Sequence, residues 1–175
     1  MKWFKRIVLI LFIAIVTVAI VVIADGYGLY KDVLEEVSLE NKVKGVRKDE
    51  DFVSLTSLPT KYQQAVIAVE DHRFYDHGPV DFIAIGRALF TNVKNGKLQE
   101  GGSTITQQVA KNVVFSQEQT WLRKVGEIFA AYDLEKNYTK NEILELYLNT
   151  SYFGNGYYTV SEASKGYFNK DAKDM

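Results

Sequence analysis

The chain has 175 residues, 47% of them hydrophobic, which is enough for one ordinary core but hardly for two. It contains no cysteine, so disulfides, thiolate metal sites and a cysteine nucleophile are excluded. The first 24 residues carry three bases and no acid. The remainder therefore holds 18 of the 21 bases and all 22 acids, a mildly acidic balance that argues against a nucleic-acid partner.

Residues 7–24 are uncharged and contain a single hydroxyl, Thr17. As a helix they span roughly 27 Å, close to the thickness of a bilayer core. Aromatic residues that suit the membrane interface flank the run: Trp3, Phe4 and Tyr27. We therefore predict a transmembrane helix at 7–24. The alternative is a cleaved secretory signal, but the run lacks the small-x-small cleavage site of such signals.

The bases of residues 1–6 precede this helix, which predicts that they form a cytoplasmic tail and that the rest of the chain is extracytoplasmic. Residues 25–51 are charged and weakly periodic, and we expect a linker or stalk without chemistry. Residues 52–175 are expected to form one domain.

Helical signals dominate that domain. Apolar-periodic runs follow capping or turn residues. The expected helices, each with its signals, are 60–70 after Ser57 and Pro59, 82–95 between Asp81 and Gly96, 103–114 after Gly101 and Gly102, 121–138, and 143–149 after the capping box Thr139–Glu142. No hairpin signal separates two alternating runs. The fold class expected is mostly α.

The stretch VEDHRFYDHGPVD, Val69–Asp81, holds the densest group of titratable side chains. Glu70 ends a predicted helix whose inner face we assign to Ala65, Ala68 and Val69. At the lip of a core, partial desolvation would raise its pKa toward the range of a general base. The alternatives are a solvated helix cap or a metal site, for which no established ligand spacing is present. The metal site would draw on Glu70, Asp71, His72, Asp76 and His77.

Two later stretches could bind an anion. Glu100–Asn112 has a glycine-led helix start of the kind that holds phosphate, although an ordinary capped helix explains it equally and no P-loop pattern is present. Arg123 and Glu127 share a helix face, with Lys124 beside them. They form either a surface ion pair or a basic pair that grips a pyrophosphate next to a second carboxylate. The aromatic-rich stretch Glu145–Phe168 is interpreted as core and turns.

Taken in order, these stretches resemble the peptidoglycan glycosyltransferases, which occur as monofunctional enzymes and as the N-terminal domain of bifunctional penicillin-binding proteins. The matching motifs are E-D-x-x-F-x-x-H-x-x-x-D at 70–81, G-G-S-T-I-T-Q-Q at 101–108, R-K-x-x-E at 123–127, I-L-E-x-Y-L-N at 143–149, Y-F-G-x-G at 152–156 and Y-F-x-K at 167–170.

The resemblance implies a lysozyme-like helical domain that polymerises lipid II into β-1,4-linked glycan strands, with inversion and release of polyprenyl diphosphate. It implies that Glu70 is the catalytic base and that Glu127 is a second catalytic carboxylate near the pyrophosphate. There Glu127 would orient Arg123 or share a divalent cation, Mg²⁺ or Mn²⁺; the sequence itself requires no cofactor.

The substrate-binding residues that the resemblance implies are Asp71, Phe74, His77, Arg87, Ser103, Thr104, Gln107, Gln108, Lys111, Arg123 and Lys124. The expected partners are lipid II, the growing glycan strand and the cytoplasmic membrane, with a transpeptidase or division and elongation proteins beside them. The expected location is the bacterial cell membrane, crossed once.

Two positions depart from the family pattern. Gln119 stands where many members carry an arginine, and the chain stops at Met175, where family domains continue with further helices. We therefore expect a domain truncated at its C-terminus. The alternative functions are a lysozyme-like or lytic glycan-cleaving enzyme, and a catalytically impaired, membrane-anchored interaction module of the cell wall.

Overall fold

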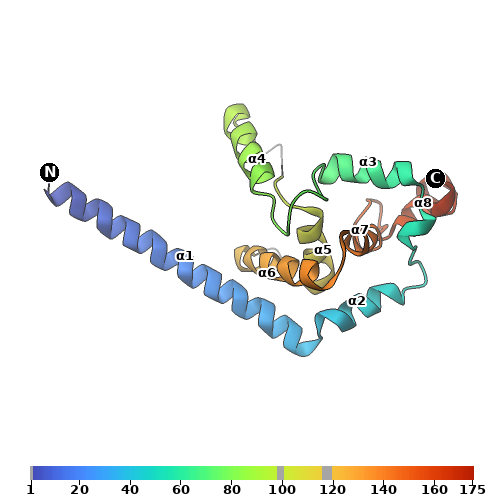
Figure 1. The fold of residues 1–175 in the computed structure, drawn as a ribbon, viewed down its shortest axis with the longest axis horizontal. Helices are drawn as coiled ribbons and strands as arrows, with labels where there is room; N and C mark the ends of the chain where they lie inside the picture. Colours follow the sequence, from blue (N-terminus) through green and yellow to red (C-terminus); the bar gives the residue numbers. More distant parts are fainter. Residues whose placement is uncertain (1, 98–100, 116–119) are drawn as a thin grey trace.

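The computed structural model describes residues 2–97, 101–115 and 120–175, which are helical with no strand in these ranges (Figure 1). The mostly α fold class is confirmed. The helices are α1 (Lys2–Glu36), α2 (Leu39–Arg47), α3 (Thr60–Glu70), α4 (Phe82–Asn95), α5 (Ile105–Val114), α6 (Trp121–Asn137), α7 (Lys140–Leu148) and α8 (Val160–Phe168), with 3-10 turns η1 (Leu55–Ser57) and η2 (Ala172–Asp174).

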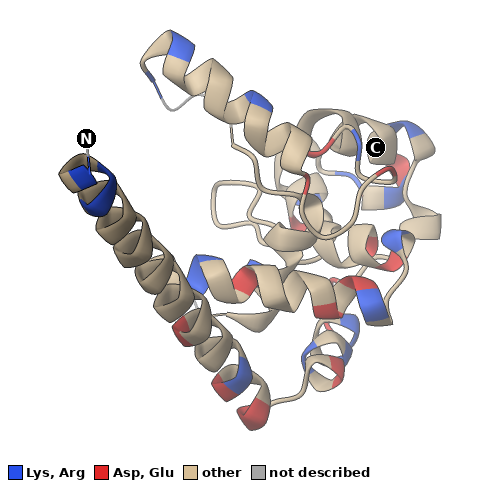
Figure 2. Cartoon of the chain, turned by 60° about the vertical axis from the view of Figure 1, so that its left-hand side comes forward, with Lys and Arg blue, Asp and Glu red and all other residues tan. Residues whose placement is uncertain are grey.

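Helix α1 is a single helix of 35 residues whose N-terminal half extends away from the rest of the chain (Figure 1). Its most apolar 18-residue window has a mean hydropathy of 3.5 and is not buried by the protein. Figure 2 shows charged residues toward both ends of α1 and an uncharged stretch between them. By length and composition α1 can cross a membrane, as predicted for 7–24.

Residues 25–51, expected as a linker or stalk, are mostly helical. They comprise the last part of α1, all of α2 and the connection to η1. Tyr30, Leu39 and Val43 are buried and belong to the hydrophobic core. The charged side chains that suggested a solvated stalk lie on the outer face of these helices, so the segment packs against the domain.

The centre of the core is α5. Ile105, Val109 and Ala110 are fully buried, and α5 packs against α6, α7 and α2. Each large apolar side chain buried in this way contributes roughly 1.5–3 kcal/mol relative to exposure. Because α5 is held on several sides, polar residues at its start and along its open face have fixed positions.

Side-chain caps begin several helices, at Asp81 and Thr139 as expected and at two further threonines. Asp81 caps α4, whose C-terminal cap is Gly96 in the left-handed region at φ 61°. Thr104 and Thr139 form capping boxes with Gln107 and Glu142. Another begins α8, at Thr159 and Glu162. These caps satisfy backbone amides that would otherwise lack partners.

The inner face of α3 differs from the prediction. Ala65, Ala68 and Val69 are exposed, Val69 by 81%, whereas Val66 and Ile67 pack against the core. All five residues are apolar enough for a core face, and the small alanines leave the larger side chains to fill the contact. The inward face of α3 is therefore formed by Val66 and Ile67.

Candidate active site

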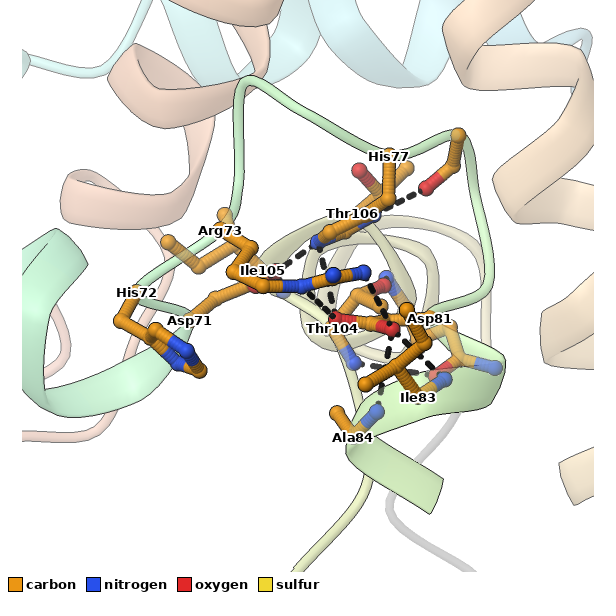
Figure 3. Close-up of polar contacts among 12 residues, drawn as sticks. Asp71, His72, Arg73, His77, Asp81, Ile83, Ala84, Thr104, Ile105 and Thr106 are labelled. Carbon is orange, nitrogen blue, oxygen red and sulfur yellow. Dashed lines mark hydrogen bonds and ion pairs between the residues drawn. The ribbon is translucent and has the colours of Figure 1, made fainter. Parts of the chain in front are cut away.

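The loop between α3 and α4 is fixed by buried hydrogen bonds (Figure 3). Asp71 Oδ2 accepts the backbone amide of Ile105 at 3.1 Å, and Asp71 Oδ1 lies 2.7 Å from His77 Nε2. His77 Nδ1 lies 2.5 Å from the carbonyl oxygen of Gly78. Both ring nitrogens thus face oxygen atoms, which fixes the orientation of the ring.

Asp81 anchors the other end of this loop. Its carboxylate receives a two-pronged contact from Arg73, at 3.1 and 2.9 Å, and accepts the backbone amides of Ile83 and Ala84. Burial raises the pKa of the Asp81 carboxyl, but the two amides and the guanidinium outweigh it, so this pKa lies below its usual value. The loop is therefore rigidly joined to the start of α4.

Asp71, His77 and Asp81 offer three ligand atoms within 4.8 Å of one another, the arrangement nearest to the metal site considered above. All their carboxylate oxygens already face hydrogen-bond donors, and the Arg73 guanidinium lies against Asp81. A divalent cation would have to displace these donors and sit beside a positive charge. The group therefore fits a structural network better than a metal centre.

The lowered pKa of Asp81 predicts acid-sensitive stability. A carboxyl whose folded pKa is depressed contributes stability above its unfolded pKa of about 3.9 and loses it as the pH falls through the folded value. We expect the urea midpoint of the parent protein in detergent to fall between pH 5 and pH 3, and Asp81→Asn to lower it at pH 5 and flatten this dependence. Asp76→Asn, at an exposed position of the same loop, is the control. Equal pH dependence in all three proteins would contradict the assignment.

Glu70 is the last residue of α3 and its side chain is exposed. The partial burial expected for it is not found, because α3 ends at the rim of a cavity instead of at the core. Glu70 Oε2 accepts a hydrogen bond from Gln108 Nε2 at 3.1 Å. The cavity has a volume of about 510 Å³ and is lined by Glu70, Gln108, Lys111, Asn112, Tyr147, Thr150, Ser151, Tyr152 and Tyr158.

Tyr147 on α7 belongs to the hydrophobic core, as expected for its stretch, and also lines the cavity. Burial and the negative charge of Glu70 raise the pKa of Tyr147 to about 12. The phenol therefore stays neutral near pH 7 beside the carboxylate. The tyrosine of the I-L-E-x-Y-L-N motif was the available signal, but its 77-residue separation from Glu70 hid their proximity.

A second group of charges lies at the first turns of α6. Glu127 is fully buried; its Oε1 accepts Arg123 Nε at 2.9 Å and its Oε2 accepts Lys124 Nζ at 2.8 Å. Lys124 Nζ also donates to Ser103 Oγ at 3.0 Å, just before α5. Among the described residues this group holds two cations and one acid, a balance that suits an anion. Because each Glu127 oxygen already has a cation as partner, the site does not fit a divalent metal ion.

Helix α5 connects the two groups. Ser103, just before α5, contacts the charged group, and Gln108, in the first turn of α5, contacts Glu70. Asp71, the neighbour of Glu70, bonds to the first amide of α5. The structure thus brings Glu70, Gln108 and Lys111 together in one cavity, and Ser103, Arg123, Lys124 and Glu127 in an adjoining cluster.

Several residues predicted to bind substrate lie inside the protein, and their substrate contacts stay a prediction. Their side chains form the frame of the site: Phe74 is fully buried, Asp71 and His77 bond to each other, and Thr104 and Gln107 form the capping box of α5. Arg87 is exposed on α4, with its Nη1 3.5 Å from His72 Nε2, and belongs to neither group. Gln119 lies outside the described residues.

Fold and site together define a helical domain with an N-terminal helix long and apolar enough to cross a membrane, an exposed carboxylate at a cavity, and a cationic cluster on α6. The transglycosylase family model matches residues 36–175, and the chain belongs to this family of glycosyltransferases. The membership expected from the motifs is confirmed. The match begins within the segment that was expected to be a stalk.

Known relatives are penicillin-binding proteins. The chain is 47% identical over 123 residues to penicillin-binding protein 1F of Bacillus subtilis (strain 168), covering 70% of this chain and 17% of the relative. It is 42% identical to penicillin-binding protein 4 of the same strain, covering 79% and 22%, and 42% identical to penicillin-binding protein 1A of Neisseria lactamica, covering 79% and 18%. The chain thus spans less than a quarter of these curated relatives.

Proposed function

We propose that the chain is a peptidoglycan glycosyltransferase that polymerises lipid II into β-1,4-linked glycan strands and releases polyprenyl diphosphate. The observation that carries the proposal is that Glu70, in a polar cavity, and the Arg123–Lys124–Glu127 group are both contacted from the short segment Ser103–Gln108. Family membership supports the same reaction.

In the proposed reaction Glu70 takes the proton from the 4-hydroxyl of the acceptor sugar. That oxygen forms a bond to the anomeric carbon of the donor as the bond from this carbon to the diphosphate breaks. The electron pair leaves with polyprenyl diphosphate, and Glu70 passes its proton to solvent. A carboxylate open to the cavity suits this role because the hydroxyl must reach it directly.

The leaving diphosphate is the proposed ligand of the charged group. Arg123 supplies a planar guanidinium with several donors, and Lys124 supplies a compact positive charge. Glu127 holds both side chains in place by accepting a hydrogen bond from each. In many enzymes, stabilising the charge that develops in the transition state accelerates the reaction more than any other single effect. We propose that this requires no divalent cation, because the Glu127 oxygens are already paired.

Inversion requires attack on the face opposite the leaving group. A base at the end of α3 and an anion site on α6, contacted by Gln108 and Ser103 respectively, suit a donor lying between them, with Lys111 in the cavity beside the base. A glycosidase that cleaves a neutral sugar bond has no need for the cationic group. This difference favours transfer over the lytic alternative.

The membrane has a direct role in this proposal, since a polyprenyl substrate stays in the bilayer. We place the N-terminus in the cytoplasm and the domain on the outer face of the bacterial cell membrane. Helix α4 supports this with exposed apolar side chains suited to lipid contact: Phe82, Ile83, Leu89, Phe90 and Val93. The strand product would pass to a transpeptidase, which together with division or elongation proteins is the proposed partner.

The test is product analysis with purified protein, lipid II and EDTA. We expect glycan polymer to form, with one polyprenyl diphosphate released for each glycosyl transfer. Lysozyme should digest this polymer. Cleavage of preformed strands without polymer formation would support the lytic alternative. Inactivity in both assays, with or without added Mg²⁺ or Mn²⁺, would support the non-catalytic interaction module.

A further inference from the structure

The membrane helix meets the charged helix α6 at Gly26, two residues beyond the apolar run 7–24. A methyl group at Gly26 would lie 2.5 Å from Val125 Cγ1 and 2.6 Å from Val125 Cβ. These distances are shorter than any van der Waals contact, and Val125 Cβ is joined directly to the backbone. The close approach of α1 to α6 therefore depends on glycine at position 26.

A second glycine, Gly126 on α6, faces α1 at the same level. A methyl group at Gly126 would lie 3.2 Å from the carbonyl oxygen of Gly26 and 2.8 Å from Phe115 Cζ. Further toward the C-terminal ends of both helices, Tyr30 stacks on Phe129 with ring centroids 6.2 Å apart. The hydroxyl of Tyr30 donates to Asp133 Oδ2 at 2.8 Å. Contact thus continues along both helices, which limits sliding and rotation of one against the other.

The contacts also set the direction of α6. Position 26 faces 125 and 126, and position 30 faces 129 and 133, so the two helices run the same way. The N-terminal end of α6 therefore points back toward the membrane-spanning half of α1, as Figures 1 and 2 show. Trp121, the first residue of α6, is 88% exposed and precedes Arg123 and Lys124. Tryptophan prefers the lipid–water interface.

We propose that the contact of Gly26 with Val125 and Gly126, here called the anchor contact, fixes the height of α6 relative to the membrane. It seats Trp121 in the lipid–water interface and holds Arg123 and Lys124 at the level of lipid phosphate groups. The anchor is then a positioning part of the site in addition to a tether. The kinetic consequence rests on the proposed function, whereas the seating of Trp121 does not.

The seating is tested by depth-dependent quenching. The chain has two tryptophans, so Trp3→Phe leaves Trp121 as the sole reporter in vesicles of phosphatidylcholine brominated at defined acyl positions. In this background we expect strongest quenching by the shallowest bromines, and a loss of about twofold or more when Gly26→Ala displaces α6. Gly28→Ala is the matched control, since a methyl there meets no atom within 4 Å. Equal quenching in the two variants would overturn the proposal.

The kinetic test compares two donors. Gly26→Ala should lower kcat/KM about tenfold for lipid II held in vesicles, yet leave turnover of a short-chain, water-soluble analogue within about twofold, because only the bilayer substrate has a fixed height. Gly26→Ala combined with Val125→Gly, which removes both clashing carbons, should recover the vesicle rate. Equal losses on both donors would reduce the contact to a structural one and overturn the proposal. If the parent polymerises neither donor, the proposed function fails while the quenching result still decides the seating.

Discussion

Replacing Glu70 with glutamine is expected to lower the rate of lipid II polymerisation by about 10²–10⁴-fold, the contribution of a general base. The amide has nearly the same shape and its oxygen can still accept from Gln108, but it cannot take a proton. Because Glu70 is exposed at the rim of the cavity, we expect the thermal midpoint of unfolding to stay unchanged.

The measurement is single-turnover polymer formation from fluorescent lipid II, with circular dichroism to check folding. Glu50→Gln, an exposed glutamate outside the cavity, is the control and should match the parent. A Glu70→Gln rate within about threefold of the parent, far below the effect of losing a base, would end the assignment of Glu70.

Glu127→Gln should have the second-largest effect, a loss of about 10²-fold in kcat/KM. The change leaves Arg123 and Lys124 without their shared acid, so that the two like charges repel and lose their orientation toward the diphosphate. Lys124 is 45% exposed on its side chain and can turn to solvent, which moderates the cost. We expect the free energy of unfolding to fall by about 1–3 kcal/mol.

A loss of stability alone must be separated from a loss of catalysis. Glu142→Gln provides this control, because Glu142 pairs with Arg47 and caps α7 outside both groups of the site. It should reduce stability and keep the catalytic rate. If both variants lose activity in proportion to their stability, Glu127 is a structural residue only.

Local signals predicted the helices well. Asp81 and Gly96 mark the ends of α4, and the capping box at Thr139 marks the start of α7. Each of these signals acts within a few residues, so it can be interpreted without knowing the tertiary structure. Grouping Arg123, Lys124 and Glu127 succeeded for the same reason, since they share one helical turn.

Side-chain direction in the loop 71–81 could not be predicted in this way. The loop has no helical or strand period, so its sequence does not say which residues face inward. Asp71 and His77 proved to hold α5 in place, and Phe74 joined the core. Tyr147 lies in the core as expected, but its place at the Glu70 cavity could not be predicted, because it depends on packing α7 against α5.

The central claim is that Glu70 and the Arg123–Lys124 pair act on one substrate across α5. The most direct test is an experimental structure of this chain with a non-reactive donor that carries a lipid diphosphate, together with an acceptor sugar. We predict diphosphate oxygens within hydrogen-bond distance of Arg123 or Lys124, and the acceptor 4-oxygen about 2.6–3.2 Å from the Glu70 carboxylate. A diphosphate bound away from both cations, with Glu70 facing empty solvent, would contradict the account.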